Sequence, residues 1–285
     1  MWFAYGVASF FAGLAVFFIP SRRRLLRENY ALVTGSDDMR YLGRLVRSAY
    51  RHIALNTVDF LQFPFLSPER IVTMARCRGL EKLDAALSRG KGVVFVTCHM
   101  GHWEYGGALL ASLGYPTVVI AESIAPKRKI LKEERIASLF REFREKTGMV
   151  VIPLESFMMP AVRALKKGRI LVFVADRDIT GQGVEVTFFG RLCRLPRGPA
   201  FFSLRMGSPI VPGYMVREKD GFHLGTICEA IEPGDLSCDE SGIRQLTQTI
   251  ASQLEKMIST RPDQWFVFER FGSEKDREFS DNRVS

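Results

Sequence analysis

Two side chains that could perform acid–base chemistry lie close together in the stretch TCHMGHWEYGG, residues 97–107. His99 is followed five positions later by Glu104. If the two face each other across a turn, the carboxylate can fix the imidazole tautomer and stabilise its protonated form. A substrate hydroxyl would then supply the attacking oxygen, with His99 as general base. We therefore predict that His99 and Glu104 form a catalytic pair that works without a protein nucleophile.

Other histidines leave an alternative open. The chain has four of them, and His52 and His223 lie in ordinary helix and strand patterns, where surface or packing roles suffice. His102 competes with His99 as the base, although it lies only two positions from Glu104. A histidine and a glutamate at this spacing also occur in purely structural roles, so the spacing alone does not decide between catalysis and packing.

Signatures of other chemistries are missing. The sequence contains no Gly-x-Ser-x-Gly, no Walker A motif and no His-Glu-x-x-His, which excludes their usual catalytic arrangements. The five cysteines are scattered without a Cys-x-x-Cys pair. We therefore expect no disulfide framework and no metal site, and a reducing cytosolic environment is the simpler interpretation.

The elements that must position His99 follow an alternating strand and helix pattern. Residues 93–98 and 170–175 are short continuous apolar runs, typical of strands buried on both faces. Further predicted elements are strands at 117–121 and 149–152, a hairpin of 210–216 with 222–227, and helices at 127–147 and 242–260, the last capped by Ser241. We predict an α/β fold with a mixed, mostly parallel sheet flanked by helices. His99 then lies at the carboxyl edge of the sheet, where such folds bind ligands.

The N-terminus differs from the rest of the chain. Residues 2–19 carry no charge, and as a helix they would extend about 27 Å, close to the roughly 30 Å hydrocarbon core of a bilayer. Arg22, Arg23, Arg24 and Arg27 follow directly, so the positive-inside rule places the remainder in the cytosol. We predict an N-terminal membrane-anchoring helix, which either spans the bilayer or lies in it. The alternative is a buried or interfacial helix.

Basic charge continues beyond this segment. Residues 39–61 have the pattern of an amphipathic helix with arginines on one face, suited to anionic lipid headgroups. The net charge of +9 is consistent with an anionic partner. Nucleic acid is disfavoured because the basic residues cluster beside the hydrophobic N-terminus and no recognised nucleic-acid-binding module is present. The predicted organisation is a membrane anchor with its basic flank at 1–27, a catalytic domain at 28–272 and a polar tail at 273–285.

Three arginines are candidate anion ligands. Arg177 follows a predicted buried strand and could bind a phosphate with both guanidinium nitrogens, or pair with a neighbouring aspartate. Arg194 and Arg197 precede Gly198-Pro199 at a predicted helix start, where free backbone N–H groups favour an anion. A solvated loop charge is the alternative for the last two.

Four ordered motifs resemble one protein family. The H-x4-E motif at His99–Glu104, the stretch ADRD followed by VTFFG, the segment PAFFSLRMGSPIVP and the closing Arg261-Pro262-Asp263-Gln264-Trp265 are similar to blocks of the bacterial lipid A biosynthesis acyltransferases. The resemblance covers residues 1–272. It implies a glycerol-3-phosphate acyltransferase-like fold and transfer of an acyl chain from acyl carrier protein or acyl-CoA to a glycolipid hydroxyl. It also implies the cytosolic face of the plasma (inner) membrane and no cofactor.

The phosphatidylinositol mannoside acyltransferases, a branch of the same superfamily, are at least as similar around residues 176–186. In that branch Glu185 would match a glutamate near the catalytic histidine, and Arg144 an arginine near the active-site entrance. The Gly-His-Trp at 101–103 departs from the common Gly-Asn-Trp, which puts the role of His102 in question. We expect an O-acyltransferase that acts on a lipid A precursor. The alternatives are an inositol mannoside or lysophospholipid acceptor, or a non-catalytic membrane-binding protein.

Overall fold

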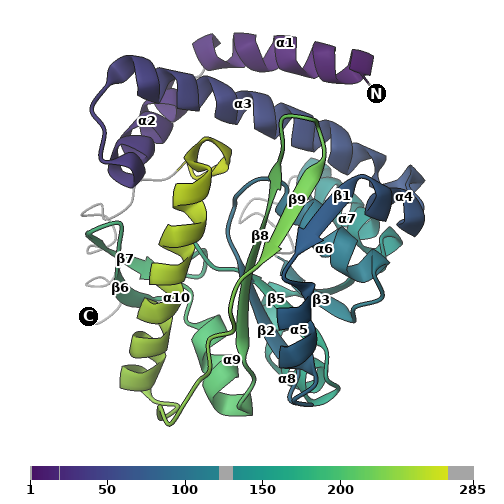
Figure 1. Cartoon of the computed structure of the whole chain (residues 1–285), viewed down its shortest axis with the longest axis vertical. Helices are drawn as coiled ribbons and strands as arrows, with labels where there is room; N and C mark the ends of the chain where they lie inside the picture. The colour runs from purple at the N-terminus through teal and green to yellow at the C-terminus, as the bar shows by residue number, and fades with distance from the viewer. Residues whose placement is uncertain (1, 19, 122–130, 269–285) are drawn as a thin grey trace.

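The computed structural model describes residues 2–18, 20–121 and 131–268 (Figure 1). The described residues form a seven-stranded sheet with the order β1-β9-β8-β2-β5-β3-β4 and a separate two-stranded sheet of β6 and β7. The strands are β1 (Ala75–Arg78), β2 (Val93–Thr97), β3 (Thr117–Ala121), β4 (Val150–Pro153), β5 (Ile170–Val174), β6 (Val184–Phe188), β7 (Arg191–Leu195), β8 (Ile210–Arg217) and β9 (His223–Ile227).

The large sheet is mostly parallel, as the sequence predicted. Strands β8, β2, β5, β3 and β4 run in one direction, whereas β9 is antiparallel to β8 and β1 is parallel to β9. The central pair, β2 and β5, is in register from Val93 opposite Ile170 to Thr97 opposite Val174. Because these two strands are parallel, the residues that follow Thr97 and Val174 meet at the same edge of the sheet.

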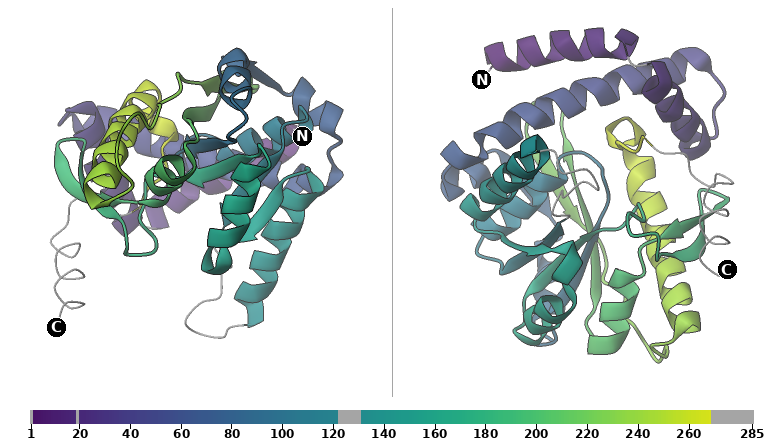
Figure 2. Two further views of the ribbon diagram at one scale, coloured as in Figure 1. Left: turned by 90° about the horizontal axis from the view of Figure 1, so that it is seen from below. Right: turned by 180° about the vertical axis from the view of Figure 1, so that it is seen from behind.

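Helices surround this sheet (Figures 1 and 2). They are α1 (Trp2–Phe18), α2 (Pro20–Thr34), α3 (Met39–Gln62), α4 (Pro68–Thr73), α5 (Leu80–Leu87), α6 (Trp103–Ser112), α7 (Leu131–Lys146), α8 (Met158–Lys166), α9 (Gly198–Met206) and α10 (Glu240–Thr260), with short 3₁₀ turns η1 (Phe63–Phe65), η2 (Leu154–Ser156) and η3 (Pro262–Gln264). Helix α10 packs against β6, β8 and α9. The predicted α/β fold is confirmed.

Most predicted elements are present, with shifted ends. The helix predicted at 127–147 is observed as α7 from Leu131, and residues 122–130 lie outside the described residues. Ser241 is not the cap of α10, because Asp239 lies at that position and its carboxylate accepts a hydrogen bond from Gly242 N at 2.9 Å. A carboxylate at the N-cap satisfies a free N–H and also interacts favourably with the positive end of the helix dipole. The predicted tail at 273–285 also lies outside the described residues.

The N-terminal helix does not support the predicted membrane span. Over the described part of the chain, no helix has both the length and the hydropathy that crossing a bilayer needs. Instead α1 lies alongside α3 across one end of the sheet (Figures 1 and 2). Its Tyr5 hydroxyl donates to the buried carboxylate of Asp59 on α3. The apolar side chains of Phe10, Phe11 and Phe18 are exposed.

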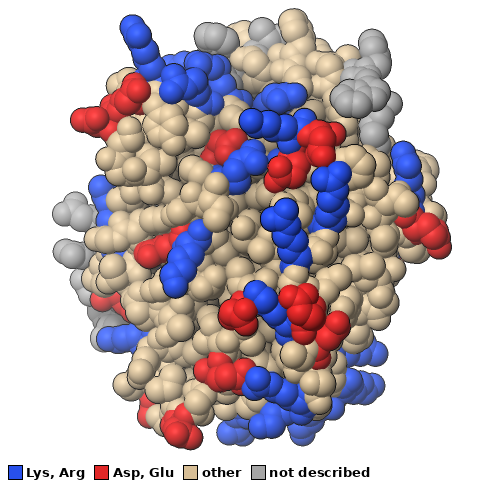
Figure 3. Space-filling view, viewed as in Figure 1, with Lys and Arg blue, Asp and Glu red and all other residues tan. Residues whose placement is uncertain are grey.

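The predicted amphipathic helix at 39–61 is confirmed as α3. Leu42, Val46 and Ala49 are buried, while Arg44 and Arg47 are exposed. On the face seen in Figure 3, basic and acidic side chains are interspersed, and one group of basic side chains lies at the upper left, where α2 and α3 meet. One group of basic side chains therefore lies next to the helix that carries the exposed phenylalanines.

Candidate active site

His99 and Asp176 meet at the carboxyl edge of the sheet. His99 follows β2, Asp176 follows β5, and Ala175 N donates to Thr97 O at 2.8 Å between them. The imidazole Nδ1 of His99 lies 2.7 Å from Asp176 Oδ1, and the His99 backbone N–H donates to Oδ2 at 3.0 Å. Asp176 is fully buried, whereas 23% of the His99 side chain is exposed. The carboxylate thus fixes the tautomer in which Nδ1 donates its proton and Nε2 can accept one.

The environment of Asp176 keeps its carboxylate ionised. Burial alone would raise its pKa, but the charge and Nδ1 hydrogen bond of His99, the indole N–H of Trp265 and the His99 backbone N–H outweigh burial and hold the pKa below its usual value. The Trp265 Nε1 donates to Oδ2 at 2.8 Å. An ionised carboxylate next to an imidazole stabilises the imidazolium formed when the histidine takes up a proton.

The loop that carries His99 is held on both sides by backbone hydrogen bonds. Gly101 N donates to Gln264 O at 2.6 Å, Phe266 N donates to His99 O at 2.8 Å, and His102 N donates to Met215 O at 3.0 Å. Gly101 adopts a positive φ of 56°, a conformation that glycine accepts without steric cost. The closing Gln-Trp motif of the sequence therefore packs directly against the His99 loop.

Glu104 does not pair with His99, so the predicted pairing is wrong. Both carboxylate oxygens of Glu104 are bonded to Arg144 on α7, with Nε to Oε2 at 2.8 Å and Nη2 to Oε1 at 2.5 Å. Glu104 and Arg144 are 15% and 18% exposed. The carboxylate that reaches the imidazole comes from the neighbouring parallel strand instead, because β5 ends directly beside β2. Glu104, Arg144 and His99 nevertheless line the same cavity.

His102 has a structural position rather than a catalytic one. It caps α6, its Nδ1 accepting from Tyr105 N at 3.2 Å. Its side chain is buried against Phe63, Tyr105 and His223. Burial lowers the pKa of His102, and the neighbouring His223 adds to that effect. The residue does not line the cavity, so the competing assignment of His102 as base finds no support.

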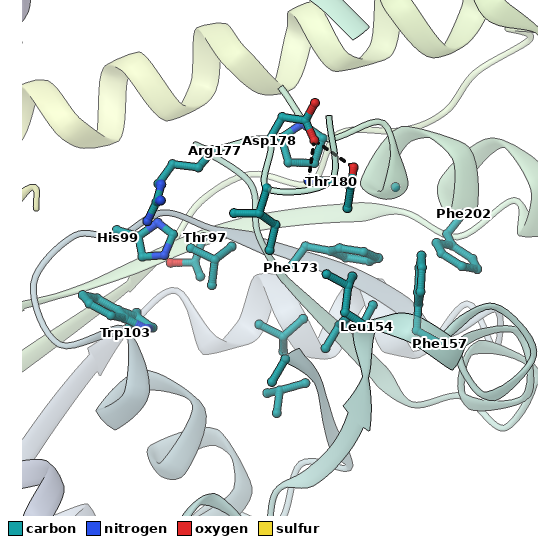
Figure 4. Close-up of a pocket in the computed structure, with 18 of the residues that line it drawn as sticks. Thr97, His99, Trp103, Leu154, Phe157, Phe173, Arg177, Asp178, Thr180 and Phe202 are labelled. Carbon is teal, nitrogen blue, oxygen red and sulfur yellow. Dashed lines mark hydrogen bonds between the residues drawn. The ribbon is translucent and has the colours of Figure 1, made fainter. Parts of the chain in front are cut away.

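A cavity of about 710 Å³ opens beside His99. Figure 4 shows His99, Trp103 and Arg177 on one side of it and Phe157 and Phe202 on the other, with Phe173 and Leu154 between them. The rings of Phe157 and Phe202 are 5.7 Å apart, and those of Phe173 and Phe202 are 5.9 Å apart. The cavity thus has a polar region around the imidazole and an extended apolar region, a combination suited to an amphiphilic ligand.

Two of the predicted anion ligands line this cavity. The side chain of Arg177 reaches toward His99 in Figure 4. Arg197 also lines the cavity, and its guanidinium is bonded to Glu240 of α10 at 2.6 Å. The carboxylate of Asp178 accepts hydrogen bonds from Thr180, Gly181 and Gly183, which shapes the loop after Arg177.

Glu185 and Arg194 lie outside the site. They face each other across the β6–β7 hairpin, and neither lines the cavity. In β6 the side chains of Val184, Val186 and Phe188 are buried, so the alternation of the strand turns Glu185 outward, where it is exposed. The structure therefore does not place Glu185 among the residues that line the cavity with His99.

Comparison with known proteins decides the family. Residues 3–271 match the family described as "Bacterial lipid A biosynthesis acyltransferase". The chain belongs to this acyltransferase family. It is also similar to the phosphatidylinositol mannoside acyltransferase of Mycolicibacterium smegmatis, with 27% identity over 86% of this chain and 77% of that protein. The phosphatidylinositol mannoside acyltransferase of Mycobacterium tuberculosis is 30% identical over 67% of this chain and 58% of its own length.

Membership in this acyltransferase family agrees with the predicted reaction class. The chain is an enzyme that transfers an acyl group, so a lipid acceptor and an acyl donor are implied. Sequence reasoning missed Asp176 and Trp265 as partners of His99, although both belong to motifs that carry the resemblance. The available signal for Asp176 was that it follows a buried apolar run directly, just as His99 does.

The Glu104–Arg144 pair of this acyltransferase is expected to hold α7 against the site. Arg144→Ala leaves a mostly buried carboxylate unpaired and should lower the free energy of unfolding by about 2–3 kcal/mol. A double-mutant cycle with Glu104→Ala, measured by urea unfolding, should show coupling of more than about 1 kcal/mol. The matched control is the exposed Arg141–Glu145 pair on the same helix, where coupling should be below about 0.5 kcal/mol. Equal coupling in both pairs would contradict a specific role for Glu104–Arg144.

Proposed function

We propose that this acyltransferase moves a fatty acyl chain from a thioester donor to a hydroxyl of a phosphorylated membrane glycolipid, with His99 as general base. The observation that carries the proposal is the bonding of His99 Nδ1 to the buried Asp176 at the edge of a largely apolar cavity. That pairing leaves Nε2 as the proton acceptor, and the cavity supplies room for a hydrocarbon chain.

In this mechanism Nε2 of His99 takes the proton of the acceptor hydroxyl as its oxygen attacks the thioester carbonyl. The tetrahedral intermediate collapses, the carbon–sulfur bond breaks, and the departing thiolate receives the proton from the imidazolium. No acyl-enzyme forms. Cys98 is an unsuitable nucleophile because its thiol is fully buried, and burial together with the nearby Asp176 raises its pKa.

The oxyanion of the intermediate needs hydrogen-bond donors. The backbone N–H groups of residues 99–102 already donate to Asp176, Cys98, Gln264 and Met215, so the Gly101 turn is not a suitable source. We assign this role to Arg177, which lines the cavity and reaches toward His99 (Figure 4).

The acceptor we favour is a phosphatidylinositol mannoside, because both relatives reported as similar are named phosphatidylinositol mannoside acyltransferases. Arg177 and Arg197, which both line the cavity, are the proposed ligands of the acceptor phosphate. A lipid A precursor is the second candidate, supported by the description of the matching family. The proposed donor is acyl-CoA or acyl carrier protein, without a further cofactor.

We also propose that the enzyme works at the cytosolic face of the plasma membrane. The exposed phenylalanines of α1 can enter the acyl–headgroup boundary. Arginines of α2 and α3, such as Arg24, Arg44 and Arg47, are exposed next to α1 and can bind anionic headgroups.

The deciding experiment is a transfer assay with the purified protein. Labelled acyl-CoA and labelled acyl carrier protein are each offered with an inositol mannoside, a lipid A precursor or a lysophospholipid, and His99→Ala provides the blank. We expect incorporation into the inositol mannoside. Incorporation only into the lipid A precursor would select the second candidate, and a labelled protein adduct at Cys98 or a serine would contradict direct transfer. No incorporation by folded protein into any acceptor would overturn the proposal.

A further inference from the structure

Trp265 is the residue that completes the hydrogen bonds of Asp176. Its side chain is fully buried, and its indole N–H donates to Asp176 Oδ2 at 2.8 Å. The ring centroid lies 6.4 Å from that of Phe188 and 5.9 Å from that of Phe189. The Trp265 carbonyl accepts from the Tyr30 hydroxyl at 2.9 Å. The backbone and the ring of Trp265 are therefore both held in place, which fixes the direction of the indole N–H.

The two oxygens of Asp176 have different partners. Oδ2 accepts from the Trp265 indole and from the His99 backbone, whereas Oδ1 faces the His99 imidazole. An indole is a donor only, it carries no charge and it does not titrate. It withdraws part of the negative charge of the carboxylate without supplying a positive charge that would compete with the imidazolium.

We propose that Trp265 is a positioning residue that acts through Asp176, lowering the proton affinity of the Asp176–His99 pair so that His99 is available as a base at a lower pH. This inference rests on the proposed role of His99 as the base. A hydrogen bond donated to a carboxylate disperses its charge and makes it a weaker acceptor for a second donor. Without the indole N–H, the carboxylate would hold the imidazolium proton more strongly.

The local backbone keeps the two partners aligned. The segment at residues 264–266 is hydrogen-bonded to the His99 loop through Gly101 N to Gln264 O at 2.6 Å and Phe266 N to His99 O at 2.8 Å. A bridge also pairs Met100 with Trp265. Trp265, which donates to Asp176, and His99, which Asp176 orients, thus belong to one hydrogen-bonded unit. In the sequence, 166 positions separate them.

Other ionisable groups also face the pair and must stay constant in any test. The thiol of Cys98 is buried near Asp176. The remaining charged groups line the cavity beside His99, and they are Glu104, Arg144, Arg177, Asp178 and Arg197. Glu104 and Arg144 are bonded to each other, the Asp178 carboxylate accepts from its own loop, and Arg197 is bonded to Glu240. Trp265→Phe removes one hydrogen bond to the Asp176 carboxylate and leaves each of these charged side chains in the protein.

The test compares Trp265→Phe with Tyr30→Phe. Trp265→Phe removes the indole N–H that donates to Asp176. Tyr30→Phe removes the buried hydrogen bond to the Trp265 carbonyl and leaves the bonds of Asp176 unchanged. Imidazole NMR, assigned with His99→Gln, follows the titration of His99 in the whole protein. We expect its midpoint to rise by about half a pH unit or more in Trp265→Phe and to stay unchanged in Tyr30→Phe. An unchanged or lower midpoint in Trp265→Phe would overturn the inference.

Acyl-transfer rates provide the second readout. The acid limb of the pH–rate profile should shift to higher pH together with the midpoint of the His99 titration. Trp265→Phe should then be about threefold slower than the wild type at low pH and equally fast at high pH. A rate that is low at every pH, with an unmoved limb, would show a merely structural role and contradict the inference. If Trp265→Phe does not fold, benzothienylalanine at position 265 replaces the N–H by sulfur in an isosteric ring, with the same criteria.

The two readouts separate this inference from the proposed function. If the wild type transfers no acyl group but the His99 titration still moves in Trp265→Phe, the proposed function fails while the electrostatic role of Trp265 stands. If transfer occurs and the titration does not move, the proposed function stands and the role of Trp265 is overturned.

Discussion

Replacing Asp176 by asparagine is expected to lower kcat for acyl transfer by about 10³- to 10⁴-fold while the fold remains intact. The reason lies in how the oxygens of Asp176 are bonded. Oδ2 already accepts two N–H donors, from Trp265 and the His99 backbone. The amide oxygen of Asp176→Asn must occupy that position, which turns the NH₂ group toward His99 Nδ1. An imidazole that accepts at Nδ1 carries its proton on Nε2 and can no longer act as base there.

Steady-state kinetics would check this expectation. KM should change little, because Asp176 is buried behind His99 and does not line the cavity. The control Asp239→Asn makes the same atomic change at the N-cap of α10, where asparagine also caps well, and should retain the wild-type rate. A variant Asp176→Asn with native melting behaviour and a kcat within tenfold of the wild type would remove Asp176 from the mechanism.

The position of His99 could be predicted from the sequence, but its partner could not. A buried apolar run followed by a histidine is enough to place that histidine at the carboxyl edge of a parallel sheet. The neighbour of β2 that leads to Asp176 is β5, which lies beyond β3 and β4 in the chain. Hydrophobic periodicity identifies strands and does not give their order. The sequence therefore favours the nearest carboxylate, Glu104, over Asp176, which is 77 positions away.

Of two other predictions that the structure does not support, only the first had a contrary signal in the sequence. The alternation of Val184, Val186 and Phe188 with polar residues indicates that Glu185 faces outward. The resemblance to a related branch implied instead a position near the catalytic histidine. The predicted membrane anchor rests on the apolar length of the N-terminal segment and on the arginines that follow it. In the structure α1 is tied to α3 through Tyr5 and Asp59, a tertiary contact between a tyrosine and an aspartate 54 positions apart that no local pattern reveals.

Gly101→Ala is expected to be the most destabilising single substitution that we predict. A Cβ on Gly101 would lie 1.7 Å from the Met215 carbonyl oxygen and 2.9 Å from Val216 Cα. These are backbone atoms of the central strand β8, so they cannot move aside as a flexible side chain would. The positive φ of 56° adds conformational strain of about 1 kcal/mol or more. We expect a loss of at least about 4 kcal/mol of unfolding free energy.

Thermal melting gives the measurement, and Gly114→Ala gives the matched control. Gly114 also has a positive φ, of 89°, but nothing lies within 4 Å of its Cβ position, so its substitution tests backbone strain without the clash. Gly101→Ala should melt about 10 °C or more below the wild type, or fail to accumulate as soluble protein, and Gly114→Ala only a few degrees below it. Because Gly101 N and O are bonded to Gln264 and Asn56, relief of the clash must displace the His99 loop. Equal melting of the two variants would mean that the loop moves freely, and the rigid positioning of His99 on which the proposed catalysis depends would then be wrong.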